Sequence, residues 1–437
     1  MRGFHDTDDE LQARIGIPAV LQGKEMQRLV MITAISRRSD ELAKWAAVMF
    51  GFALPLSTAL DGLFLALTVL LWLLGGRFRE KYDLIRSNPV ALAALAMCGV
   101  YLLGLLYGQA DKSGLSDIKT FLLIPLMITL FQEERIRRYA WWGFQSSMLL
   151  TLALSYLIFL RVLPEYLGTK VGPIRPGTVQ MTSIAQNLFM AYTAFVLAAK
   201  ARFADQLRRR ALFAALSVLA AVNVLFVVPS KTGQLVLLLL IGYYLVDWLR
   251  WKGVVVAAAV MVLVAGVIYG MPTSAVHVRL SELIREYEQW RPDLPASTAS
   301  ATGLRMEFYQ QSLKIIGENP LFGVGAGDFH SAYKEMVGTS PRVVTDNPHN
   351  QYLLTGVELG LVGLAVLGAL FFVQWRMAGR LPRGEERMLA FALLLAILSG
   401  CLFNSFLTDH SEGLFYMWTT ALLYAGFSRQ PNAEQRS

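Results

Sequence analysis

The residues best suited to chemistry lie between positions 303 and 363. A long polar segment ends in Asp346-Asn347-Pro348-His349-Asn350, and Gly360 and Gly363 follow in the next apolar run. A histidine where a polar segment enters an apolar helix sits at the water boundary, where it titrates near neutrality and can reach a substrate hydroxyl. The alternative is a helix-start histidine, with the two glycines allowing close helix packing. His349 is therefore a candidate general base.

Three cations and one carboxylate also lie on the predicted outer face. Arg305 opens a helical pattern, where the helix dipole disfavours a cation, so an anionic ligand would explain its position. Arg175 and Lys231 each precede a further helix, and both could instead be interfacial anchors. Asp409 could orient an imidazole from another helix, or belong to a solvated turn. No single one of these residues identifies a site, and their predicted placement on one face of the membrane is the stronger evidence.

Three glycines alternate in Gly323-Val324-Gly325-Ala326-Gly327. Glycine permits a sharp backbone turn, and backbone amides exposed in this way can bind an anion. We favour the simpler interpretation, which is a flexible link between two surface helices.

The composition places these residues in a membrane protein. Of 437 residues, 55% are hydrophobic and 16% are charged, whereas soluble domains carry about 25% charged residues. Apolar stretches of spanning length recur along the chain, which excludes soluble, collagen-like, coiled-coil and disordered classes. Cys98 and Cys401 both lie in apolar runs, so a disulfide scaffold is excluded too.

Hydropathy predicts an all-α polytopic membrane protein with about twelve transmembrane helices. The apolar segments cover roughly 43–60, 61–75, 89–107, 117–131, 140–160, 184–200, 211–228, 234–249, 253–270, 350–375, 388–407 and 412–427. Lys and Arg gather in alternate connections, so the positive-inside rule places both termini in the cytoplasm. The net charge of +8 then reports orientation and does not indicate an anionic partner.

This topology divides the chain into five parts: a cytoplasmic extension over 1–42, helices over 43–270, a periplasmic loop over 271–349, helices over 350–427 and a cytoplasmic tail over 428–437. The loop has helical periodicity near 276–287 and 304–316, which predicts amphipathic surface helices. A loop of this length with its own structure is usually functional.

Familiar catalytic and cofactor motifs are missing from the sequence. It contains no GxGxxG, GxxxxGK[ST], HExxH or CxxC pattern. No pair of histidines or carboxylates on the predicted outer face has the spacing of metal ligands. We expect neither a metal nor a cofactor.

The order His349-Asn350, nine residues, Gly360-x-x-Gly363 resembles the O-antigen ligase (WaaL) family and its O-antigen polymerase-type relatives. Arg305 with Pro320-Leu321-Phe322-Gly323-Val324-Gly325 resembles the large periplasmic loop of the same family. The predicted topology agrees with this resemblance, which covers most of the chain from about residue 43.

The resemblance implies a metal-independent C-type glycosyltransferase in the inner membrane of a Gram-negative cell. Such a ligase transfers O-antigen from undecaprenyl diphosphate to a sugar hydroxyl of lipid A–core oligosaccharide at the periplasmic face, completing lipopolysaccharide. By motif position, His349 is the expected base and Arg305 the expected diphosphate contact. Arg175 and Lys231 would also bind the diphosphate. The family often has an arginine in the loop that contains Lys231, so Lys231 offers a point charge in place of a guanidinium. Asp409 and Asn350 are candidate orienting or acceptor contacts.

Three other functions remain open. An O-antigen polymerase or a protein O-oligosaccharyltransferase would use the same donor chemistry, and the short segment after the last predicted span favours a lipid or glycan acceptor over a protein. If the protein were a transporter or flippase, Glu358 within the apolar segment would be a coupling residue. Transport leaves the His–Asn motif unexplained, and the sequence lacks paired broken helices in two halves.

Overall fold

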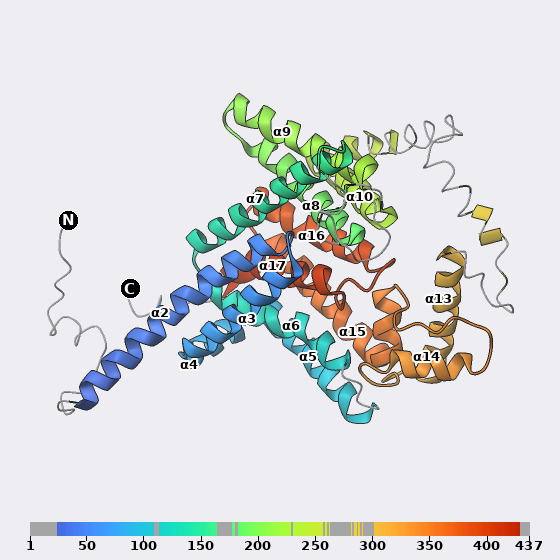
Figure 1. Cartoon of the computed structure of the whole chain (residues 1–437), viewed down its shortest axis with the longest axis horizontal. Helices are drawn as coiled ribbons and strands as arrows, with labels where there is room; N and C mark the ends of the chain where they lie inside the picture. Colours follow the sequence, from blue (N-terminus) through green and yellow to red (C-terminus); the bar gives the residue numbers. More distant parts are fainter. Residues whose placement is uncertain are drawn as a thin grey trace.

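The computed structural model describes residues 24–108, 113–163, 177–179, 182–228, 230–256, 258–259, 262, 281, 284–285, 287–288, 291 and 301–428. Within these ranges the ordered elements are all helices (Figure 1). The first half contains α2 (Lys24–Ala53), α3 (Thr58–Leu74), α4 (Phe78–Ser87), α5 (Pro89–Tyr107), α6 (Ser113–Leu130), α7 (Glu134–Phe159) and α8 (Ser183–Phe203). The second half contains α9 (Leu207–Val222), the π-helical η2 (Asn223–Val227), α10 (Lys231–Leu249), α13 (Ala301–Glu318), α14 (Phe329–Val337), α15 (Gln351–Arg380), α16 (Glu385–Gly400), α17 (His410–Tyr424) and the short 3-10 η3 (Ala425–Phe427).

Polar residues placed just before apolar runs start several of these helices. The Asn88 side chain accepts hydrogen bonds from the amides of Val90 and Ala91, and Pro89 occupies the first helical position of α5. Thr182 caps α8 in the same way. These caps satisfy amides that have no partner inside the helix.

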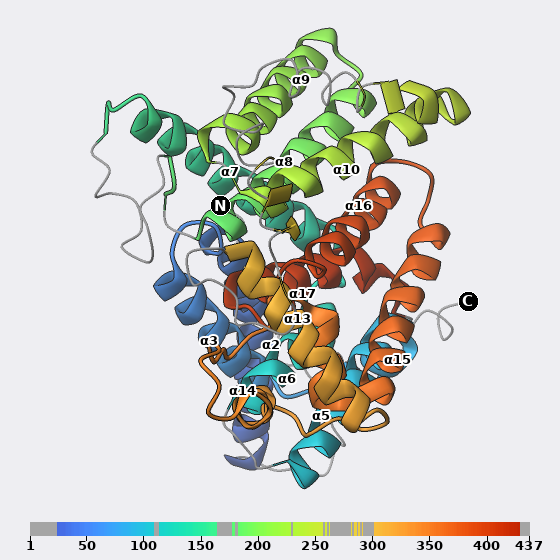
Figure 2. The ribbon, with the colours of Figure 1, turned by 90° about the vertical axis from the view of Figure 1, so that its right-hand side faces the viewer.

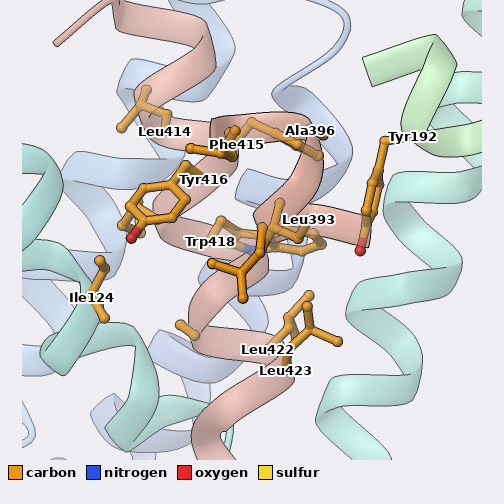
Figure 3. Packing of buried hydrophobic residues seen from close by; sticks show 14 of the residues in the cluster. Ile124, Tyr192, Leu393, Ala396, Leu414, Phe415, Tyr416, Trp418, Leu422 and Leu423 are labelled. Carbon is orange, nitrogen blue, oxygen red and sulfur yellow. The ribbon is translucent and has the colours of Figure 1, made fainter. Parts of the chain in front are cut away.

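The centre of the molecule is built around α17, whose residues from Ser411 to Tyr424 are all buried. Phe415 packs against Phe189 of α8, with ring centroids 4.6 Å apart. Trp418 donates its indole N–H to the carbonyl of Ala47 in α2, at 3.0 Å. Figure 3 shows Phe415 and Trp418 among side chains from neighbouring helices. The last helix is thus a core element enclosed by the others.

Ion pairs connect the helix ends that the sequence predicts to be cytoplasmic. Each of the four pairs joins two separate segments: Lys44–Glu133 at 2.6 Å, Lys81–Asp40 at 3.0 Å, Lys200–Glu385 at 2.8 Å and Arg202–Asp247 at 2.8 Å. Helix ends predicted to share one side of the membrane therefore meet in space. That these helix ends face the cytoplasm stays a prediction.

The predicted outer ends also meet one another. His410 Nε2 lies 3.2 Å from Oδ1 of the fully buried Asp61. The Asn404 amide donates to the hydroxyl of Thr232, at 3.1 Å. Both contacts lie at helix ends or connections that the charge pattern assigns to the outer face.

The twelve predicted spans are confirmed only in part. Six of the described helices are long and apolar enough to cross a membrane, or seven if the bent pair α3–α4 counts as one span. Several other predicted segments form helices of 15–17 residues, including α16 and α17. A helix enclosed by its neighbours, such as α17, is apolar on every side without having to match the bilayer. The predicted segment 253–270 lies mostly outside the described residues.

The structure also changes two predicted boundaries. Helix α2 begins at Lys24, so the predicted extension 1–42 contributes helix from that residue onward, and residues 1–23 lie outside the described part. The predicted span 350–375 corresponds to α15, which is long and apolar enough to cross a membrane and extends to Arg380. Gly360, with φ 62° and ψ −157°, breaks α15 into an outer half and a long second half.

The break in α15 is filled by residues 320–325. The amides of Val324 and Gly325 donate to the carbonyls of Val357 and Glu358, at 2.9 and 3.0 Å. In return, the amides of Leu361 and Val362 donate to the carbonyls of Pro320 and Leu321, at 2.8 and 3.1 Å. Four backbone hydrogen bonds thus replace those that the kink removes.

The alternating glycines are therefore not a flexible link, contrary to our sequence interpretation. A Cβ on Gly323 would lie 2.4 Å from the carbonyl oxygen of Val357, and a Cβ on Gly360 would lie 2.4 Å from the carbonyl of Leu321. Both glycines have positive φ as well. Only glycine lets the two backbones approach so closely.

Helices α13 and α14 pack on the outer half of α15 around a small separate core. Phe308 and Ile315 of α13 meet Phe329 and Tyr333 of α14, and Val357 of α15 completes the cluster. Figures 1 and 2 show both helices beside this end of α15. Helix α13 confirms the helix predicted near 304–316, whereas α14 was not predicted. The helix predicted near 276–287 lies mostly outside the described residues.

We predict that Gly360→Ala will destabilise the protein by at least about 3 kcal/mol, because alanine is strained at this φ and ψ and overlaps the docked segment. Gly368→Ala is the matched control, since Gly368 is helical and its added Cβ meets nothing within 4 Å. That change should alter stability by no more than about 1 kcal/mol. Thermal unfolding of the purified protein in detergent measures both; equal midpoints for the two variants would contradict the role of Gly360.

Candidate active site at the start of helix α15

Hydrogen bonds to its backbone amide and carbonyl hold His349 in place, and its imidazole is the group available for chemistry. It adopts φ 55°, which is uncommon for a residue with a side chain. Its amide donates to Oδ1 of Asn347, at 2.7 Å, which is a turn typical of asparagine. The hydroxyl of Tyr309 lies 3.2 Å from the His349 carbonyl oxygen and 3.1 Å from that of Leu402. Three segments of the chain therefore fix this one residue.

Residues 401–409, between α16 and α17, form the platform under His349. The side chain of Asn350 caps α15 through the amides of Tyr352 and Leu353 and donates to the Leu402 carbonyl, at 3.0 Å. Ser405 donates to Asn347 Oδ1, at 2.7 Å. Because its polar atoms are engaged in this way, Asn350 positions the histidine.

Arg305 lies on α13, one turn before Tyr309, and its positive charge acts on His349. Burial and the Arg305 guanidinium both lower the pKa of His349 from its usual value of 6.5. The imidazole is therefore neutral at pH 7, as a general base requires. Within the described residues, Arg305 forms no ion pair with a carboxylate. Its charge thus stays available to an anionic ligand.

A buried ion pair fixes the far side of α13. Arg342 Nη1 lies 3.2 Å from Oε2 of Glu307, which is 1% exposed. The pair ties the helix that carries Arg305 to the segment leading to His349. Since a buried charge without its partner is strongly destabilising, this contact specifies how the two segments align.

Lys231 is connected to the same platform through its neighbour. It is the first residue of α10, where its side chain is exposed, and the next residue, Thr232, bonds to Asn404 of the platform. Arg175 lies outside the described residues. The nearby Gly177, with φ 79°, packs against Val227 close to the start of α10.

Asp409 lies on a different side of the site, in an acidic cavity of about 400 Å³. The lining includes Asp117 of α6, Asp346, Asn347 and Glu358. Burial raises the pKa of Asp409 to about 6. Glu358 is 2% exposed, and its Oε2 has no hydrogen-bond partner within the described part of the chain. Asn347 borders both this cavity and His349, so the two regions adjoin.

Metal ligands do not gather at this site. Across the described ranges, no group of three or more His, Cys, Asp or Glu side chains could hold an ion. Both cysteines are buried thiols.

Residues 215–368 match the family model described as O-antigen ligase (Wzy_C). The matched region contains α10, α13, α14 and the break in α15, and with them Lys231, Arg305 and His349. Arg175 and Asp409 lie outside it. Comparison with curated proteins gave no match. The match supports membership of the O-antigen ligase and polymerase superfamily and a ligase- or polymerase-type activity, and the apolar helices make the chain a multi-pass membrane protein.

Sequence reasoning missed the residues that hold the histidine. Tyr309 stands four residues after Arg305, on the same face of α13, and this spacing was a usable signal. Asn347, two residues before His349, matches the pattern of an asparagine turn. Ser405 and the carbonyl of Leu402 carried no signal, because their contact with residues 347–350 depends on the tertiary fold.

We predict that an NMR titration of histidine-labelled protein will give His349 a pKa below 6.5. The signal is assigned by its loss in His349→Gln. Arg305→Gln should move the pKa upward, because a cation that opposes protonation has been removed, whereas Arg305→Lys should leave it low. An unchanged pKa in Arg305→Gln would show that the guanidinium does not act on the imidazole.

Proposed function

We propose that the protein is an O-antigen ligase. It transfers a glycan from undecaprenyl diphosphate to a sugar hydroxyl of lipid A–core oligosaccharide, at the periplasmic face of a Gram-negative inner membrane. The observation that carries the proposal is a neutral histidine beside an arginine that pairs with no carboxylate among the described residues, both inside the region that matches the O-antigen ligase family.

Arg305 binds the diphosphate of the donor, with Lys231 and Arg175 as further contacts. A guanidinium can hold phosphate oxygens through two parallel hydrogen bonds. As the bond between the anomeric carbon and the diphosphate oxygen breaks, negative charge grows on the leaving diphosphate. The cations stabilise this charge in the transition state, which is the part a metal ion plays in other glycosyltransferases.

His349 accepts the proton of the acceptor hydroxyl while that oxygen forms the new bond to the anomeric carbon. The electron pair of the broken bond leaves with undecaprenyl diphosphate, and attack from the opposite face inverts the configuration. The half-buried, neutral imidazole suits this step because its protonated form is disfavoured before the hydroxyl attacks.

The acceptor sugar lies in the acidic cavity. Its carboxylates and amide accept hydrogen bonds from sugar hydroxyls, and Asn347, which also accepts the His349 amide hydrogen, links the cavity to the histidine. Asp409 orients the acceptor in this arrangement.

The break in α15 does not support the transport alternative. Residues 320–325 dock into the break and satisfy the backbone groups that it frees.

Replacing the base should abolish transfer. We expect His349→Gln to lower the rate of glycan transfer at least about 100-fold, since general base catalysis contributes that much or more. Lys314→Gln, an exposed cation on α13, is the control and should keep the normal rate. The assay measures glycan-bearing lipid A–core from purified, reconstituted protein; near-normal transfer by His349→Gln would remove the base assignment.

The choice of acceptor distinguishes the alternatives. The reconstituted protein is given one lipid-linked glycan donor together with lipid A–core, unfinished lipid-linked repeat units or a serine-containing secreted protein. We expect only lipid A–core to be modified, with release of undecaprenyl diphosphate. Extension of the repeat units would identify a polymerase, modification of the protein would identify a protein oligosaccharyltransferase, and donor movement without cleavage would identify a flippase.

A further inference from the structure

A second cavity lies at the opposite end of the molecule, among the predicted cytoplasmic ends of α8, α10 and α16. It has a volume of about 630 Å³, within the usual range of ligand pockets. Four arginines line it: Arg202, Arg250, Arg383 and Arg387. Asp247 is the one acidic residue in the lining, so these groups together carry a formal charge of +3.

The charge of this cavity is only partly neutralised by the protein. Arg202 pairs with Asp247 at 2.8 Å. The other three arginines form no ion pair within the described residues. Arg250 ends α10 with φ 54°, a conformation that side chains rarely adopt and that is often found at ligand sites. Three cations that form no ion pair among the described residues can be neutralised by an external anion or solvated by bulk water.

Aromatic rings hold two of the guanidinium groups. Arg387 lies over Phe391 with 5.8 Å between the guanidinium carbon and the ring centroid, and Arg202 lies over Phe203 at 5.5 Å. A stacked guanidinium keeps its edge N–H groups free for the oxygens of a phosphate. The Arg387 guanidinium is therefore placed to bind phosphate oxygens in the cavity.

The rim of the cavity is apolar and exposed. Trp248 is 56% exposed, and Phe203 and Val246 are also open to the surroundings. Tryptophan at the end of an apolar helix marks the membrane interface. A ligand that fills this site thus combines an anionic phosphate with an apolar tail that continues along the helices. A soluble phosphate would leave the apolar rim unused.

We propose that this cavity binds the headgroup of an anionic phospholipid, with the phosphodiester between Arg383, Arg387 and Arg250 and the acyl chains along Trp248 and Phe203. Basic pockets between membrane helices on the cytoplasmic side suit such headgroups. The lipid would join α8, α10 and α16 at the end of the molecule remote from His349. This inference does not depend on the proposed reaction.

The test uses the full chain purified in a neutral detergent. Phosphatidylglycerol should raise the midpoint of thermal unfolding in a saturable way, whereas phosphatidylcholine and an equal concentration of inorganic phosphate should not. A shift of equal size with inorganic phosphate would identify a free-anion site and overturn the lipid assignment.

Two variants and a matched control locate the effect. Arg383→Gln removes an exposed guanidinium, and Arg383→Gln/Arg387→Gln removes two; we expect at least about tenfold weaker phosphatidylglycerol binding for the double variant. Arg208→Gln/Arg209→Gln removes two exposed arginines outside the cavity and should bind as the unaltered chain does. Should the double variant fold poorly, Arg383→Gln alone is measured by native mass spectrometry. Equal lipid binding by the cavity variants and the control would overturn the proposal.

Discussion

The structure depends on one requirement, which is that the backbone groups freed by a break in an apolar helix must find partners. Gly360 breaks α15, and residues 320–325 supply the missing donors and acceptors. This exchange attaches α13 and α14 to the helix that begins directly after His349. The relative position of Arg305 and His349 therefore depends on these backbone hydrogen bonds together with side-chain contacts such as the Glu307–Arg342 pair.

The site combines a rigid backbone with two side chains that remain available. The histidine is fixed through its amide and carbonyl by Asn347 and Tyr309, and its imidazole takes no part in that support. On the opposing helix, the Glu307–Arg342 pair orients α13 while Arg305 stays free of carboxylates among the described residues. Fixed supports around reactive groups reduce the reorganisation needed during a reaction.

Much of the helical framework could be predicted from the sequence. The apolar run 89–107 coincides with α5, because Asn88 and Pro89 mark its start, and the run 184–200 lies within α8 for a similar reason. Hydropathy could not reveal the break at Gly360, since a glycine inside an apolar helix more often packs against a neighbour. The break is specified by a segment far upstream. Hydropathy also assigned a membrane span to α17, whose apolar residues face other helices.

The candidate site was predictable in its residue types and only partly in its geometry. His349 and Arg305 were predicted from motif order, and the structure places them close enough for the Arg305 charge to lower the pKa of His349. Their supports, Tyr309 and Ser405, act through contacts with carbonyls or with residues distant in sequence, which no local pattern reports. Asn350, considered for the acceptor, is occupied in capping α15.

The hydrogen bonds from residues 401–409 have a consequence for the synthesis of the protein. The carbonyl of Leu402 and the hydroxyl of Ser405 support Asn350 and Asn347, although both are translated well after His349. A nascent chain that has produced the loop and α15 therefore has the histidine but not its platform. The hydrogen-bonded arrangement around His349 can form only once residue 405 has been synthesised, so a partly made chain holds the histidine without these supports.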